Sequence, residues 1–236
     1  MYTRLISRLS DALLPGRCLL CNLPAASAFA LCPGCENSLP RLSSQCQVCA
    51  EPLVDDAVCG RCLRDPPDFF QIVCPFSYEG DMRHLIGALK HGGQLSAGAA
   101  LGELLGQHLA DTADNLFRPQ YLVPMPLHWR RRWHRGFNQA REIARGVVKS
   151  IDIPIRDDLL YRINHTAPQQ RLSRQARQHN MKHAFSAPKD CRGLHLAIVD
   201  DVVTTTSTAR AAASALEKAG VASVQIWCVA RTALEN

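Results

Sequence analysis

The chain has 236 residues, of which 47% are apolar, 20% are charged and only 6% are aromatic. This composition excludes a disordered or collagen-like chain and is typical of a globular protein. The length allows one large domain, or a medium domain with a small companion. The net charge is +6, and residues 121–185 alone carry 13 basic and 4 acidic side chains, a balance of +9. A positive field confined to one stretch favours a phosphate-rich partner.

The amino end contains neither a secretory signal nor an apolar run long enough to cross a bilayer. We therefore expect a cytoplasmic protein that is not itself transmembrane. Residues 5–14 place leucine and isoleucine at helical spacing and predict a short amphipathic helix. Packing against the protein is favoured over a membrane surface, because only Arg4 and Arg8 would face the lipid headgroups.

Eight of the 11 cysteines fall before residue 63, in four CxxC pairs. The pairs are formed by Cys18, Cys21, Cys32, Cys35, Cys46, Cys49, Cys59 and Cys62. Cytosolic thiols are kept reduced and redox CxxC motifs occur singly, so a disulfide or redox interpretation is disfavoured. Eight thiolates fill two closed tetrahedral zinc sites. Sequential and cross-braced pairing both remain open, with the sequential pairing of zinc ribbons favoured.

The segment that holds these pairs is poor in aliphatic residues, so metal binding must supply much of its folding free energy. A proline-marked joint follows at residues 64–70. We predict a first domain over residues 1–66, with the helix and the double zinc ribbon, and a second over residues 67–236. The single cysteines Cys74, Cys191 and Cys228 lie in or beside apolar runs and are interpreted as core residues.

Strand and helix patterns alternate through the second domain. In chain order they predict a strand at 72–78, helices at 81–93 and 95–110, a strand at 120–127, a helix at 136–151, a strand at 195–199, a helix at 208–219 and a strand at 224–229. This alternation predicts an α/β fold with a mostly parallel sheet flanked by helices. Ligands of such sheets bind beyond the carboxyl ends of the strands.

Two carboxylates and a run of small hydroxyl residues follow the strand at 195–199. The order is Asp200, Asp201, Val202, Val203, Thr204, Thr205, Thr206, Ser207 and Thr208. Hydroxyls and free backbone N–H groups before a helix can hold an anion, and carboxylates can accept bonds from a diol or hold Mg2+. A phosphorylated ribose has both groups. The alternative is an Asp-rich turn with a Ser/Thr helix cap.

VDDVVTT, residues 199–205, resembles the phosphoribosyl-diphosphate (PRPP) signature of type I phosphoribosyltransferases. LKHGG (89–93), LVPMPLH (122–128), RRWHRGFNQA (131–140) and RLSRQARQHNMKHAF (171–185) extend the likeness. With the leading cysteines, these motifs resemble the ComF family in order over nearly the whole chain. The resemblance implies a type I phosphoribosyltransferase-like domain behind a small zinc-ribbon domain, and a role in natural competence, DNA uptake or DNA utilisation.

In that family the carboxylates Asp200 and Asp201 would bind the ribose hydroxyls at the catalytic centre, and Val202 to Thr208 would hold the 5-phosphate. The diphosphate, with Mg2+, would lie near Lys90, His91 and Gly92. Two positions depart from the family, which usually has Gly and Ala where this chain has Thr206 and Ser207. If the loop needs φ > 0 at Thr206, a β-branched residue strains it, so turnover is left open. Competence proteins at the inner membrane are the partners that the resemblance implies.

The basic stretch (residues 128–182) predicts contact with single-stranded DNA, because arginines pair with phosphates and neighbouring rings stack on bases. The candidate residues are Arg130, Arg131, Arg132, Trp133, Arg135, Arg174, Arg177 and Lys182. The alternatives are a solvated surface or binding of the PRPP diphosphate. For the whole chain, the competing hypothesis is an active phosphoribosyltransferase of nucleotide metabolism whose acceptor the sequence does not name.

Overall fold

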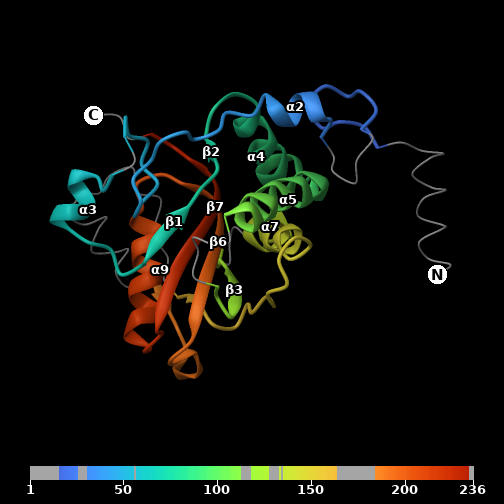
Figure 1. The fold of residues 1–236 in the computed structure, drawn as a ribbon. Helices are drawn as coiled ribbons and strands as arrows, with labels where there is room; N and C mark the ends of the chain where they lie inside the picture. Colours follow the sequence, from blue (N-terminus) through green and yellow to red (C-terminus); the bar gives the residue numbers. More distant parts are fainter. Residues whose placement is uncertain are drawn as a thin grey trace, which may run out of the picture.

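The computed structural model describes residues 16–25, 31–55, 57–112, 118–127, 133, 135–163 and 184–233. Its centre is a parallel sheet in the order β1-β7-β6-β3, with β2 also paired to β7 (Figure 1). The strands are β1 (Gln71–Val73), β2 (Phe76–Ser77), β3 (Tyr121–Pro124), β6 (His195–Val203) and β7 (Ser223–Arg231). A small antiparallel pair joins β4 (Tyr161–Arg162) to β5 (Phe185–Ser186). The predicted parallel α/β sheet is confirmed.

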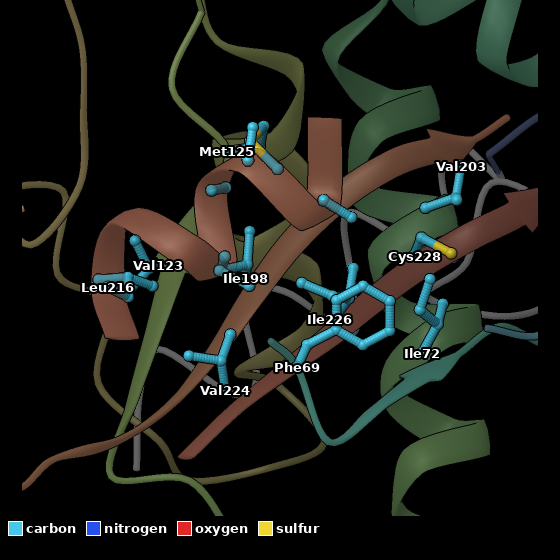
Figure 2. Packing of buried hydrophobic residues seen from close by; sticks show 14 of the residues in the cluster. Phe69, Ile72, Val123, Met125, Ile198, Val203, Leu216, Val224, Ile226 and Cys228 are labelled. Atoms are coloured by element: carbon cyan, nitrogen blue, oxygen red, sulfur yellow. The ribbon is translucent and has the colours of Figure 1, made fainter. Parts of the chain in front are cut away.

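Helices cover both faces of the sheet. One face carries α4 (Gly80–Gly92), α5 (Leu95–Asp111) and α7 (Gln139–Val147), and the other carries α9 (Ser207–Lys218), as Figure 1 shows. Shorter helices are α2 (Pro33–Asn37), α3 (Gly60–Arg64) and the 3-10 turn η2 (Lys189–Cys191). Successive residues of β6 alternate between the faces, since Ile198 packs toward α9 (Figure 2) and Val199 toward α5. Burial on both faces explains the continuous apolar run in β6.

Glycines allow α5 and α7 to pack closely on one face. A side chain at Gly102 would place its Cβ 2.1 Å from the carbonyl oxygen of Ile143 on α7, and one at Gly146 would place its Cβ 2.6 Å from the carbonyl oxygen of Ala99 on α5. Both distances are far below van der Waals contact, so the backbones meet directly. This contact fixes α7, whose amino end lies at the end of β3.

All four predicted strands differ from the observed ones at their ends, and for two of them the reason is clear. The strand predicted over 72–78 is divided at Cys74 and Pro75, because proline has no N–H for a ladder bond. Both halves still pair with β7 in parallel. The strand predicted over 195–199 continues to Val203, because Val202 and Val203 extend the ladder to Ala230 and Arg231 of β7. Asp200 and Asp201 therefore belong to the strand itself.

The cysteine-rich segment packs on the sheet domain. Cys46, Cys49 and Cys62 share a buried cluster with Ile72 and Ile226 of the sheet. Cys18, Leu31 and Leu39 share the other cluster, with residues of α4 and α5. Backbone bonds join the two parts as well, since the amide of Ile72 donates to the carbonyl of Val48 at 2.8 Å. The segment is thus continuous with both cores, and the boundary at residue 66 stays a prediction.

The amphipathic helix predicted over residues 5–14 lies outside the described residues. Across the described part of the chain, every helix is too short or too polar to cross a bilayer.

Candidate functional site

The eight cysteines of the CxxC pairs form two groups of four. In each group all four sulfur atoms lie within 4.8 Å of one another. The first zinc group is Cys18, Cys21, Cys32 and Cys35, and the second zinc group is Cys46, Cys49, Cys59 and Cys62. Tetrahedral Zn–S bonds of about 2.3 Å place sulfurs about 3.8 Å apart, so the donor set fits structural zinc. The favoured sequential pairing is confirmed.

Each group contains one cysteine whose environment favours the thiolate. Burial raises the pKa of Cys46, but hydrogen bonds from backbone amides outweigh it and bring the pKa to about 7. One of these bonds, from the amide of Cys59, is 3.3 Å long. Cys18 shows the same balance, with a pKa of about 6. Thiolates are the species that bind zinc, and backbone donors to ligand sulfurs are typical of such sites.

The carboxylate pair, Asp200 and Asp201, lies near the carboxyl end of β6. Asp200 faces Cys228 across the ladder to β7, and Pro124 at the end of β3 pairs with the preceding residue, Val199. Burial raises the pKa of Asp200 well above its ordinary value, and the negative charge of Asp201 adds to the rise. The pair therefore sits at the edge of the sheet where parallel sheets bind ligands, and it carries repulsion that a ligand could relieve.

Lys90 joins this site from the last turn of α4. Its Nζ lies 2.6 Å from Oδ2 of Asp201, a buried carboxylate. His91 and Gly92 follow at the exposed end of the helix, which closes at Gly93 with a φ of 63°. The structure thus brings one of the three residues predicted for the diphosphate into direct contact with the carboxylate pair.

The threonine loop (residues 204–207) connects β6 to α9. Thr204 and Thr205 are exposed, whereas Thr206 is buried and has φ 63° and ψ −4°. Thr206 thus has the positive φ that strains a β-branched residue, as the sequence analysis considered for this position. Such a residue costs on the order of 1–3 kcal/mol. The hydroxyls of Thr205 and of Ser207, the first residue of α9, lie 3.0 Å apart.

The basic stretch begins a few residues after β3, which ends at the same edge of the sheet. Asn138 Nδ2 donates to the carbonyl of Met125 at 3.2 Å, and Asn138 Oδ1 accepts from the amide of Ala140 at 3.1 Å, capping α7. Asn138, at the start of α7, therefore lies beside the end of β3. Trp133 is 84% exposed, and Arg135 is partly exposed. The other candidates, Arg130, Arg131, Arg132, Arg174, Arg177 and Lys182, lie outside the described residues.

One residue of the site was missed by the sequence analysis. Arg231 ends β7 and is fully buried, and its guanidinium donates to backbone carbonyls of the second zinc group and of the threonine loop. The sequence did offer one signal, because Arg231 directly follows the mostly apolar run VQIWCVA. A charged side chain buried in such a run needs several hydrogen-bond acceptors. The identity of those acceptors could not be read from the sequence, because they come from segments about 30 and 180 residues away.

Comparison with known proteins finds a match for each of the two parts of the chain. A family model described as a double zinc ribbon domain matches residues 9–63, and one described as a phosphoribosyl transferase domain matches residues 134–234. DNA utilization protein YhgH of Salmonella typhimurium is 36% identical, over 92% of this chain and 98% of that protein. Its Escherichia coli counterpart is 34% identical over the same shares. Competence protein F of Haemophilus influenzae is 33% identical, over 91% of this chain and 96% of that protein.

The fold, the two cysteine groups and these matches define a phosphoribosyltransferase-like domain joined to a double zinc ribbon. The chain belongs to the ComF family, which includes DNA utilization protein YhgH and competence protein F.

Proposed function

We propose that this protein binds PRPP and Mg2+ at the carboxyl edge of its sheet and uses this site in DNA uptake or utilisation. The observation that carries the proposal is the carboxylate pair on β6, followed within a few residues by the threonine loop and the amino end of α9. Asp200 and Asp201 would accept hydrogen bonds from the 2′- and 3′-hydroxyls of the ribose. Hydroxyls and backbone N–H groups of residues 202–208 would bind the 5-phosphate.

The diphosphate would lie beside Lys90, His91 and Gly92, with Mg2+ offsetting its charge. Lys90 is within reach because its amine already lies against Asp201. The positive charge of Lys90 can compensate the negative charge of either the carboxylates or an incoming diphosphate. In a reaction, charge would build up on the diphosphate as its bond to C1 breaks, so positioning and neutralisation would be the main contributions of these residues.

Thermal unfolding in the presence of PRPP and Mg2+ tests the binding. A ligand that binds only the folded state adds RT ln(1 + [L]/Kd), about 2.7 kcal/mol at 100 times Kd, so the melting temperature should rise by several degrees. Ribose 5-phosphate and diphosphate alone should each give a smaller rise, because each meets one part of the site. No rise with PRPP at millimolar concentration would contradict the proposal.

Replacing Thr206 tests the strain in the threonine loop. Thr206→Gly should preserve or strengthen PRPP binding, because glycine adopts φ 63° without the clash of a Cβ. Thr206→Ala is the matched control, since it removes the hydroxyl and the branch but keeps the Cβ. Calorimetric affinities should rank the glycine variant at or above wild type and above the alanine variant. A clear weakening in Thr206→Gly alone would show that the side chain itself is needed.

We further propose that single-stranded DNA binds across residues 128–182, beside the PRPP site. Two features of the described residues support this proposal. The ring of Trp133 is exposed, and the hydrogen bond from Asn138 to the carbonyl of Met125 holds Asn138 beside the end of β3. The balance of +9 in residues 121–185 supplies the electrostatic attraction.

Salt titrations of oligonucleotide binding, followed by fluorescence anisotropy, test this part. Arg131→Ala with Arg135→Ala should weaken binding to all sequences and flatten the slope of log K against log[salt] by about 1.4, at about 0.7 per lost phosphate contact. Trp133→Ala should cost about 1–3 kcal/mol with little change in slope, if the ring stacks on a base. Full retention of affinity in both variants would mean that DNA binds elsewhere on the chain.

A working transferase remains the second candidate function, because the carboxylate pair and Lys90 suit PRPP chemistry as well as PRPP binding. Release of diphosphate from PRPP, screened against bases, ammonia and single-stranded DNA, distinguishes the two. Turnover with one of these acceptors would identify an enzyme. Binding without turnover would identify PRPP as a ligand of a DNA-handling protein.

A further inference from the structure

Arg231 links the second zinc group to the threonine loop. It is the last residue of β7, pairs with Val203 at the end of β6, and is fully buried. A guanidinium stays charged in proteins and carries five N–H donors in a fixed plane. In such a buried position, each donor needs an acceptor, so the surrounding oxygen atoms determine where this side chain can lie.

The acceptors fall on two sides of the guanidinium. On the zinc side, Nε donates to the carbonyl of Cys49 at 3.1 Å, and Nη2 donates to the carboxylate of Glu51. On the loop side, Nη1 donates to the carbonyl of Val203 at 3.1 Å, to that of Thr204, and to that of the following residue, Thr232, at 2.8 Å. One rigid group therefore holds a zinc-ligand residue, the end of β6 and the first residue of the threonine loop in a fixed relation.

The zinc side is itself built around the cysteines. The amide of Ala50 donates to the carbonyl of Cys46 at 2.9 Å, and the amide of Cys46 donates to the carbonyl of Glu51 at 2.8 Å. Ala50 has a φ of 53°, so the chain turns sharply directly after Cys49. This turn aims the Cys49 carbonyl and the Glu51 side chain at Arg231. Zinc bound by the four sulfurs would hold the turn closed.

We propose that Arg231 is a positioning residue through which zinc in the second group holds the threonine loop in its binding conformation. Cys18 of the first zinc group lies in the other buried cluster, with residues of α4 and α5, and Cys32 and Cys35 pack against that cluster. The first group has no described bond to Arg231. The two zinc sites, alike in ligand set, therefore have different roles. Loss of the second should loosen the loop, and loss of the first should not. The consequence for affinity rests on the proposed function, because the loop is the proposed phosphate site.

Hydrogen exchange of single amides, followed by NMR in the full-length zinc-loaded protein, tests the coupling without PRPP. Two amides report on the loop region, since Thr232 donates to the carbonyl of Val203 and Arg210 to that of Thr206. The amide of Ala222, bonded to Leu194 at the opposite end of β7, is the control for global unfolding. Cys59→Ala removes a ligand of the second group, and Cys21→Ala is the matched change in the first.

In Cys59→Ala, exchange at Thr232 and Arg210 should rise at least about tenfold while Ala222 changes less. In Cys21→Ala, the two loop amides should stay within about twofold of wild type. Equal exchange in the two variants, or no rise in Cys59→Ala, would overturn the proposal.

Glu51→Gln keeps all eight cysteines and weakens the tether to Arg231, together with the longer ion pair between Glu51 and Arg61 (3.6 Å), so it serves if a cysteine variant does not fold. Exchange at Thr232 and Arg210 should rise in this variant at unchanged zinc content, and wild-type exchange there would overturn the proposal. Calorimetry with PRPP and Mg2+ adds an affinity readout, in which Kd should rise about tenfold in Cys59→Ala only. If the wild type fails to bind PRPP while the exchange pattern holds, the proposed function fails and the coupling stands.

Discussion

Removal of zinc should unfold residues 18–62 and also lower the stability of the sheet domain. Structural zinc contributes about 10–16 kcal/mol in zinc-finger peptides near pH 7, which matches or exceeds the stability of a typical domain, about 5–15 kcal/mol. The sheet domain is affected because Cys46, Cys49 and Cys62 lie in one buried cluster with Ile72 and Ile226. The sequence alone indicated an independent module, which would leave that domain unchanged.

Elemental analysis, circular dichroism and thermal melts before and after chelation measure this. The purified protein should carry close to two zinc ions per chain. After chelation, the melting transition of the remaining structure should shift downward, and added zinc should restore it. Zinc near zero in the folded protein, or mass mapping that finds the eight cysteines oxidised in pairs, would contradict the assignment.

Asp200→Asn with Asp201→Asn should abolish most of the stabilisation by PRPP. An amide keeps the shape of each side chain but removes the charge that would attract Mg2+ and accept strong bonds from the ribose hydroxyls. The thermal shift with PRPP and Mg2+ should fall from several degrees to near zero. An unchanged shift in the double variant would place the sugar elsewhere.

The single variant Asp200→Asn separates binding from folding. The folded-state pKa of Asp200 is raised above its unfolded value, so this carboxyl costs folding free energy at every pH above its ordinary pKa. This variant should therefore melt at a higher temperature than wild type without ligand, and the difference should shrink as the pH falls toward the ordinary pKa of an aspartate. Melts between pH 4 and 8 test this, and a lower melting temperature at pH 7 would contradict the assigned repulsion.

Sequence patterns predicted the order of strands and helices well, and the main errors were in the residues at which the elements begin and end. The strand before Asp200 was predicted to end at Val199, where the apolar run HLAIV ends. In the folded protein Lys90 compensates Asp201, so the strand can continue to Val203. That ion pair joins residues 111 positions apart and has no local signal.

The cysteine spacing predicted two zinc sites because all eight ligands come from short, regular motifs. The spacing could not decide the pairing, which depends on how the loops fold back. Arg231 was missed for a related reason, since its acceptors belong to distant segments that meet only in the tertiary structure.

The proposed function requires that PRPP binds at the carboxyl edge of the sheet. The most direct measurement is a titration of the isotope-labelled, zinc-loaded protein with PRPP and Mg2+, followed through backbone amide NMR signals. We expect saturable shifts at residues 200–208 and at Lys90 to Gly93, with little change at Ala222 and the opposite end of the sheet. Saturable shifts confined to other residues, or no shifts at millimolar PRPP, would contradict the account.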